Sequence, residues 1–152
     1  IEIMRNFRQI TAIFSILFLM VGSFVMAQDK IINYNQLPQN AQKFLASHFK
    51  NIKTSSIIED REIFGVDEYK IHMANGMKVE FDSKGNWTEV DGKHQKVPYN
   101  YIPASIRNYI AKTFPNTHII KMERKTYSYK AELSNGLDLE FDAKGNFKKI
   151  DD

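Results

Sequence analysis

The sequence predicts an α+β protein of two tandem α-β-β-β-β repeats, each a helix packed on a four-stranded antiparallel sheet. Three observations support this prediction: a phrase that occurs twice, a helical pattern ahead of each copy, and alternating strands within each copy. The phrase "NGMKVEFDSKGNWTEVD" begins at Asn75, and "NGLDLEFDAKGNFKKID" begins at Asn135. Internal duplication of this kind indicates a repeat architecture.

Each copy opens with a predicted helix. "LPQNAQKFLASHF" covers residues 37–49 and "IPASIRNYIAKTF" covers residues 102–114, and apolar residues recur in both at helical spacing. Pro38 and Pro103 stand where a first-turn proline removes no helical hydrogen bond. A single apolar stripe predicts that each helix covers one face of a sheet. The alternative is a stripe that binds a membrane surface or a partner.

Four strands are expected in each copy. Apolar and polar residues alternate most cleanly in the middle pair, which predicts an antiparallel sheet with one buried face. The expected strands are residues 56–62, 67–73, 77–82 and 86–91, and then 118–124, 127–133, 137–142 and 146–151.

The repeated phrase is explained by hairpin structure. A two-residue turn would place Ile71 opposite Glu80, which puts an apolar and a charged residue on one face. A three-residue loop at 74–76 instead pairs Met73 with Met77, and every core residue then meets a core residue. Glycine ends the loop because this hairpin class needs a left-handed residue there.

Two positions break the alternation in the last strand of each copy. Strict alternation would place Val90 and Ile150 on the polar face, and Glu89 and Lys149 on the core face. The sequence therefore predicts a β-bulge or early fraying that turns each apolar residue inward. The alternative is an apolar spot exposed for binding.

Residues 1–27 are typical of a secretory signal peptide, with two arginines, an uncharged apolar run and a Val25-x-Ala27 cleavage site. An uncleaved anchor is the alternative. Once the peptide is cleaved, no stable membrane anchor is expected, and the predicted location is periplasmic or secreted. The expected division is 28–36 as an N-terminal extension, 37–91 as repeat 1, 92–101 as a linker and 102–152 as repeat 2.

Composition argues against most enzyme and cofactor classes. A net charge of +3 over 152 residues is too mild to predict nucleic-acid binding. The absence of cysteine excludes thiol nucleophiles, thiolate metal sites and disulfides. The four histidines show no metal-binding spacing, and the 82–86 turn lacks the alternating acids of a calcium loop. We therefore expect no enzymatic activity, no cofactor and no metal.

The tandem order behind a signal peptide resembles the PepSY-like, β-lactamase-inhibitor-like family of exported bacterial proteins, common in Bacteroidetes. The resemblance covers residues 37–152 and rests on the "LP…F" helix and the "NG…FD…G" hairpin phrase. It implies a binding module for an envelope or secreted protein, such as an enzyme or a peptidase. β-Lactamase inhibition is not carried over, because this chain lacks the cysteines of the namesake inhibitor and its expected open face is charged.

The candidate partner-binding residues are the charged residues expected on the open face of the sheet and two tyrosines of the linker. They are Lys70, His72, Lys78, Glu80, Lys130, Glu132, Asp138, Glu140, Tyr99 and Tyr101. The linker tyrosines are expected to cover the seam between the repeats, or alternatively to form an aromatic patch for a partner or glycan. The acids of the second sheet include an expected like-charge pair, which either binds a cation or a basic surface or is solvated decoration.

The sequence thus predicts an exported, non-enzymatic binding module that is protein-binding or inhibitor-like, acting through its sheet faces and linker. One alternative is a periplasmic protein that binds a small molecule, a peptide or a cation. The other is a structural envelope protein that associates with itself. The sequence sets no oligomeric state.

Overall fold

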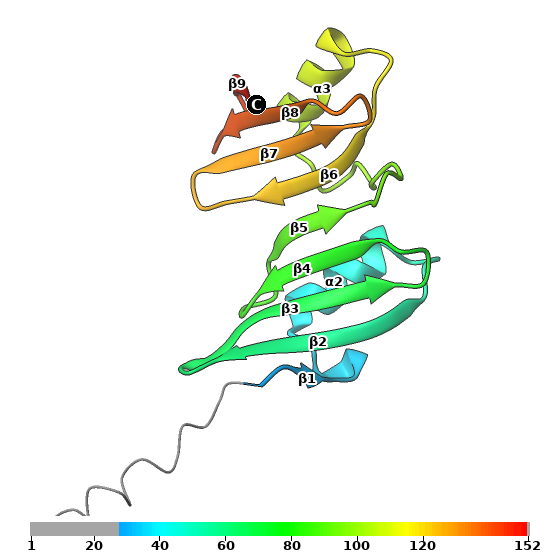
Figure 1. Ribbon diagram of the computed structural model, residues 1–152, viewed down its shortest axis with the longest axis vertical. Helices are drawn as coiled ribbons and strands as arrows, with labels where there is room; N and C mark the ends of the chain where they lie inside the picture. The colour runs from blue at the N-terminus through cyan, green and yellow to red at the C-terminus, as the bar shows by residue number, and fades with distance from the viewer. Residues whose placement is uncertain (1–27, 152) are drawn as a thin grey trace, which may run out of the picture.

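The computed structural model describes residues 28–151, which form one open antiparallel sheet of nine strands with helices on one side (Figure 1). The strands follow one another in chain order from β1 to β9. The predicted α+β class is confirmed, whereas the two four-stranded sheets expected from the sequence are joined into one. The expected signal peptide lies outside the described residues.

Every strand and helix predicted from the sequence is present within two residues of its expected bounds. The strands are β2 (Thr54–Glu62), β3 (Gly65–Met73), β4 (Lys78–Asp82), β5 (Trp87–Asp91), β6 (Ile119–Arg124), β7 (Ser128–Leu133), β8 (Asp138–Asp142) and β9 (Phe147–Asp151). The helices are α2 (Gln39–His48) and α3 (Ala104–Thr113). The short strand β1 (Lys30–Ile31) and the 3-10 helix η1 (Tyr34–Gln36) were not predicted. Within residues 28–151, no helix is long and apolar enough to cross a membrane.

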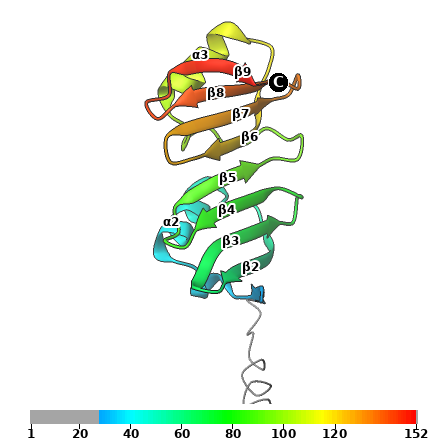
Figure 2. The ribbon, with the colours of Figure 1, turned by 60° about the vertical axis from the view of Figure 1, so that its left-hand side comes forward.

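Both long helices lie on the same face of the sheet and leave the other face uncovered (Figure 2). The core fills the space between the helices and the sheet. Phe44 of α2 meets Phe81 edge-on at 5.5 Å between ring centroids, and Tyr109 of α3 meets Phe141 in the same way at 5.8 Å. Both phenylalanines of the sheet are fully buried.

The hairpin between β3 and β4 has the predicted three-residue loop. The Met73 amide donates to the Met77 carbonyl over 2.9 Å, and Ile71 pairs with Val79. Gly76 closes the loop with φ of 89°, in the left-handed region that only glycine adopts freely. The predicted register is therefore confirmed.

A β-bulge shifts the register of β5 by one residue. Trp87 pairs with Phe81, whereas Glu89 pairs with Glu80, so Thr88 is the extra residue. Strict alternation would have placed Glu80 opposite Thr88, and the bulge instead moves Glu89 onto the polar face. The predicted bulge is confirmed here.

The bulge turns the next apolar residue toward the core. Val90 pairs with Val79 and is 0% exposed. The same shift occurs in β9, where Ile150 pairs with Leu139. Ile150 nevertheless stays 44% exposed because β9 is the last strand of the sheet.

The two halves of the chain are joined by direct pairing of β5 with β6. Val90 lies opposite Met122 at the centre of three paired positions. The linker packs against this seam: Val97 is almost completely buried, and its amide donates to the Ile119 carbonyl over 3.0 Å. The sheet and the core therefore run without interruption from one half to the other.

Candidate functional site: the charged face of the sheet

Two rows of mainly charged side chains cross the uncovered face from β3 to β9, with one residue of each row on each strand. The pairing register places Lys70, Glu80, Glu89, Glu123, Lys130, Glu140 and Lys149 in the first row. It places His72, Lys78, Asp91, Lys121, Glu132, Asp138 and Asp151 in the second row. We call these two rows the charged face.

The structure brings all eight predicted sheet residues into these two rows. The sequence placed them on two separate sheets, four on each. The residues that connect the two sets were missed: Glu89, Asp91, Lys121 and Glu123. Glu89 was not named as a site residue, although the predicted bulge turns it to the polar face. No signal in the sequence foretold that β5 would pair with β6.

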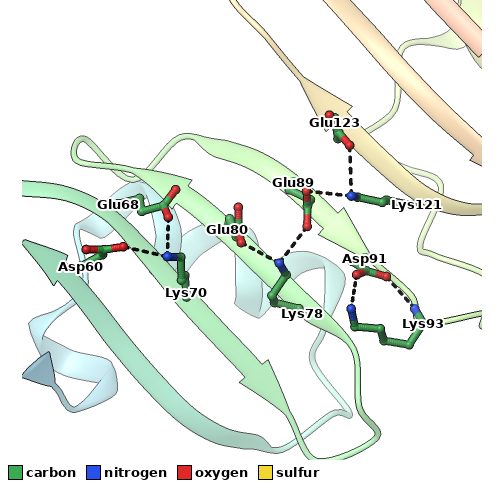
Figure 3. Close-up of polar contacts among 10 residues, drawn as sticks. All are labelled: Asp60, Glu68, Lys70, Lys78, Glu80, Glu89, Asp91, Lys93, Lys121 and Glu123. Atoms are coloured by element: carbon green, nitrogen blue, oxygen red, sulfur yellow. Dashed lines mark hydrogen bonds and ion pairs between the residues drawn. The ribbon is translucent and has the colours of Figure 1, made fainter. Parts of the chain in front are cut away.

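Lysines of the second row bridge carboxylates of the first row at the seam (Figure 3). The Lys78 Nζ lies 2.7 Å from a Glu80 oxygen and 3.0 Å from a Glu89 oxygen. The Lys121 Nζ lies 3.1 Å from both Glu89 and Glu123. Like charges directly opposite one another destabilise a sheet, so these lysines offset the repulsion among the three acids.

The lysines of the charged face stay protonated. Burial alone would lower the pKa of Lys121, but hydrogen bonds to Glu123 and Glu89 outweigh it and raise the pKa. Hydrogen bonds to Asp60 and Glu68, each of 2.7 Å, raise the pKa of Lys70 above its ordinary value. These lysines therefore keep their positive charge at neutral pH.

In the second half, the predicted like-charge pair is confirmed. Glu132 lies directly opposite Asp138. The Lys130 Nζ lies 3.0 Å from Asp138 and 3.2 Å from Asp151, so Lys130 compensates the acids beside it. A small cavity of about 140 Å³ opens here, lined by Lys121, Glu123, Lys130, Glu132 and Asp138.

The charged face is more acidic than the rest of the chain. Its two rows hold eight carboxylates and five lysines, whereas the whole chain carries a net charge of +3. Most of the lysines are already paired within the sheet. The excess carboxylates therefore give the face a net negative charge toward a partner. A basic surface complements this face best.

The linker tyrosines do not join the charged face. Tyr101 lies on the helix side, with its ring 5.2 Å from Phe44 and 5.0 Å from Trp87 between centroids. Burial raises the pKa of the Tyr101 hydroxyl. Tyr99 is half-buried against the core, with the Lys96 Nζ 4.4 Å from its ring. Tyr101 is therefore a core residue at the seam, as one of the two interpretations predicted.

Exposed apolar residues at hairpin tips were missed by the sequence reasoning. Ile63 and Phe64 form the turn between β2 and β3, and Tyr127 lies at the turn between β6 and β7; all three are largely or fully exposed. These turns lie at the same end of the strands in both views (Figures 1 and 2). The sequence signal that could have identified the first tip is the apolar pair Ile63 and Phe64 beside charged residues. Such aromatic residues are common anchors in protein interfaces.

A cleft opens beside the seam where β5 and β6 diverge. It has a volume of about 670 Å³, and its lining includes Thr88, Arg124 and Tyr129. The Arg124 guanidinium lies 5.1 Å from the Trp87 ring, a cation–π contact that holds the cation at the cleft. This cleft lies beside the seam that the sequence proposed as an alternative binding site.

The turn that was weighed as a calcium loop has a structural role. Asp82 Oδ1 accepts hydrogen bonds from the amides of Lys84 and Asn86, at 2.9 and 2.8 Å. Its Oδ2 accepts from the Asn86 side chain at 3.0 Å. Both oxygens are therefore engaged in closing the β4–β5 turn.

Loss of this aspartate should show a characteristic pH dependence. Burial alone would raise the pKa of Asp82, but the bonds from Asn86 and the two amides outweigh it and lower the pKa. A lowered pKa gives stability that is complete above the ordinary value near 3.8 and is lost as pH falls through the folded-state pKa. We expect Asp82→Ala to cost about 1.5 kcal/mol at pH 7 and progressively less below pH 4.

Urea unfolding of both proteins across this pH range measures the difference. Asp67→Ala, at an exposed aspartate outside the turn, serves as the control and should change little. A loss that stays constant with pH would contradict this role for Asp82.

Comparison with known proteins agrees with this architecture. Residues 67–149 match the model of the PepSY-like family, described as "beta-lactamase-inhibitor-like, PepSY-like". A Bacteroides thetaiotaomicron periplasmic protein proposed to be calcium-regulated is 41% identical, with a TM-score of 0.77 over 82% of this chain and 97% of that one. A Bacteroides vulgatus protein of the DUF2874 family, described as periplasmic, is 39% identical, with the same TM-score over 82% and 98%.

A further Bacteroides vulgatus structure, also described as periplasmic and of unknown function, is 33% identical with a TM-score of 0.77. The match covers 82% of this chain and 100% of that one. No curated protein sequence matches the chain. The family match extends over more than half of the chain, and the solved structures match nearly all of the described part. The chain is therefore a periplasmic protein that belongs to the PepSY-like family.

Proposed function

We propose that this chain is a non-enzymatic binding module of the periplasm that docks a protein with a basic surface on its charged face. Two tandem repeats supply the two halves of that face. The continuous pair of charged rows across β3 to β9 is the observation that carries the proposal. The ion pairs hold the side chains in place before a partner arrives, which reduces the ordering cost of binding.

The lowered pKa values of two acids on the charged face favour a binding role for them over general-acid catalysis. A general acid needs a raised pKa, usually produced by an apolar pocket. Asp91 shows the opposite: burial would raise its pKa, but Lys93 and its backbone amide outweigh burial and lower it. The pKa of Glu140 is lowered as well, chiefly by its hydrogen bond from Lys148. Both acids are therefore suited to fixed negative charge.

The exposed hairpin tips complement the charged rows. Charged surfaces steer and orient a partner, whereas aromatic residues supply much of the binding energy. Phe64 and Tyr127 stand at one end of the strands that carry the charged face. A partner that spans the face and reaches this end of the strands would contact both the charged residues and the aromatic residues.

Capture of a partner tests the proposal. The chain from Gln28 is immobilised, and proteins retained from periplasmic and secreted fractions are identified by mass spectrometry. We expect a saturable partner with a basic surface, whose retention falls as ionic strength rises. Retention of nothing by the folded chain, or of an acidic protein, would contradict the proposal.

A single substitution should separate binding from stability. Glu132→Lys changes the charge by two units on the charged face. Position 132 lies between Lys121 and Asp138, so the change exchanges one opposite-charge neighbour for another. We expect the free energy of unfolding to change by less than about 0.5 kcal/mol and partner retention to fall at least tenfold.

The matched control is Gln39→Lys combined with Asn108→Lys. This double variant adds the same two charges at exposed positions on the helices, on the opposite side of the molecule. It should retain the partner as the unmodified chain does. Equal losses in both variants would mean that net charge matters and that the charged face does not.

Cation binding is the second candidate function, because one similar protein is proposed to be calcium-regulated. The acids that fit best are Glu132 and Asp138, which lie opposite one another. A thermal-shift titration with calcium chloride tests it, since a ligand that binds only the folded state raises the Tm. A shift abolished by Glu132→Gln would support this candidate, and an unchanged Tm would eliminate it.

A further inference from the structure

The last strand of the sheet has a free edge. β9 pairs with β8 on one side, and within residues 28–151 no strand pairs with its other side. Ile150 faces the core yet remains 44% exposed, whereas Val90, which holds the corresponding position in β5, is 0% exposed. The difference arises because β6 pairs with the outer side of β5 and covers Val90 there. Free edges of this kind are templates for a further strand.

We propose that β9 pairs with β9 of a second copy of this chain, antiparallel and about a two-fold axis at Ile150. The sequence along this edge is Lys149, Ile150, Asp151. When a second copy runs antiparallel to it, positive residues lie opposite negative ones. Lys149 of each copy would lie opposite Asp151 of the other copy. The two Ile150 side chains would meet at the axis and cover each other. A two-fold axis makes such an interface isologous.

The other symmetric registers of this strand are unfavourable. Centring the pair on Lys149 places two lysines opposite each other and sets Ile150 against Lys148. Centring it on Asp151 opposes two aspartates. A register shifted by one residue would place Ile150 opposite a charged residue whose side chain points to the other face of the sheet. The Ile150 register alone matches apolar with apolar and positive with negative.

The seam inside the chain shows that the geometry is feasible. β5 and β6 pair over three positions, centred on Val90 and Met122, and the proposed pair uses the same three positions of β9. Helix α2 packs over β4 and β5, where Phe44 contacts Phe81 and Trp87, and β6 pairs beside it. Helix α3 packs in the same way, with Tyr109 stacked on Phe147 at 4.6 Å. Lys148, Lys149 and Ile150 of β9 stay exposed, so α3 leaves the outer side of this strand accessible.

The dimer would have two properties. A three-position strand pair buries little surface, so the association is weak and depends on concentration. A two-fold axis perpendicular to the sheet keeps both sets of helices on one side, so the two charged faces become one surface. The proposal does not depend on the function proposed for that face.

Sedimentation velocity of the chain from Gln28, at concentrations up to about 1 mM, gives the first result. We expect a reversible monomer–dimer equilibrium that Ile150→Lys shifts to monomer. A protein that stays monomeric throughout would overturn the proposal. So would a dimer that Ile150→Lys leaves intact, because another surface would then hold it.

Charge exchange tests the register. Lys149→Asp gives an edge with two acids, and Asp151→Lys gives an edge with two lysines, so each variant should be monomeric alone. Mixed in equal amounts, they should form a heterodimer, because each acid then faces a lysine. Circular dichroism and the fluorescence of Trp87 confirm that each variant is folded. If Ile150→Lys dissociates the dimer but the mixture stays monomeric, the two-fold register is wrong.

Discussion

Replacing Phe81 with alanine is expected to lower the free energy of unfolding by about 3–5 kcal/mol. Phe81 is fully buried on β4, near the middle of the sheet, with Tyr69 and Trp87 as its cross-strand neighbours. Phe44 of α2 packs edge-on against its ring. Truncation therefore leaves a cavity where the sheet and the helix meet, and neither can close it alone.

Phe64→Ala is the matched control. It removes the same side chain from the fully exposed tip of the β2–β3 hairpin, so the expected change is within about 0.5 kcal/mol. Urea unfolding followed by far-UV circular dichroism measures both variants. If the two variants lost similar amounts, Phe81 could not have the central packing role that the structure gives it.

Gly85→Ala is expected to destabilise the protein more than Gly76→Ala. Both glycines have left-handed conformations, with φ of 82° and 89°, and an added Cβ costs about 1–2 kcal/mol in such a conformation. At Gly76 the Cβ would meet nothing within 4 Å. At Gly85 it would lie 2.7 Å from the Pro38 Cβ and 3.0 Å from the Ala41 amide nitrogen, so α2 would have to move.

We expect this displacement to add about 1–3 kcal/mol to the loss at Gly85. Urea unfolding of the two variants side by side isolates the contribution of the helix contact, because the backbone strain is common to both. Equal losses would show that the start of α2 yields to the added methyl group without cost.

Much of the fold could be predicted because it is determined locally. The hairpin loops follow from the position of glycine, and the bulges follow from the pair of residues that break the alternation in each last strand. Val90 illustrates this. Its inward orientation could be predicted because burying an apolar side chain stabilises the fold more than leaving it exposed. These rules act within a few residues, so a single sequence contains them.

The joining of the two halves could not be predicted in the same way. Pairing of β5 with β6 depends on the path of the linker, which brings Val97 beside Ile119. No periodic pattern indicates a pairing such as that of Val90 with Met122, which lie about 30 residues apart in the sequence. The exposed tips were missed for a related reason: alternation identifies the two faces of a sheet and is silent about its ends.

The candidate site was consequently predicted in parts. Its eight sheet residues were correctly assigned to the uncovered face, but Glu89 and Lys121, which connect them, were not recognised. The predicted bulge already implied that Glu89 turns to the uncovered face. Lys121 reaches Glu89 only because β5 pairs with β6. Tyr101 was proposed both as a cover of the seam and as a binding residue, and its contacts with Phe44 and Trp87 assign it to the seam.

A partner bound on the charged face should leave the helix side free. Acetylation of lysines with and without the captured partner, read by mass spectrometry, distinguishes the two sides. We expect protection of Lys70, Lys78, Lys121 and Lys130 on the charged face, with unchanged labelling of Lys43 and Lys112 on the helices. Protection of the helix lysines, with the lysines of the charged face still reactive, would contradict it.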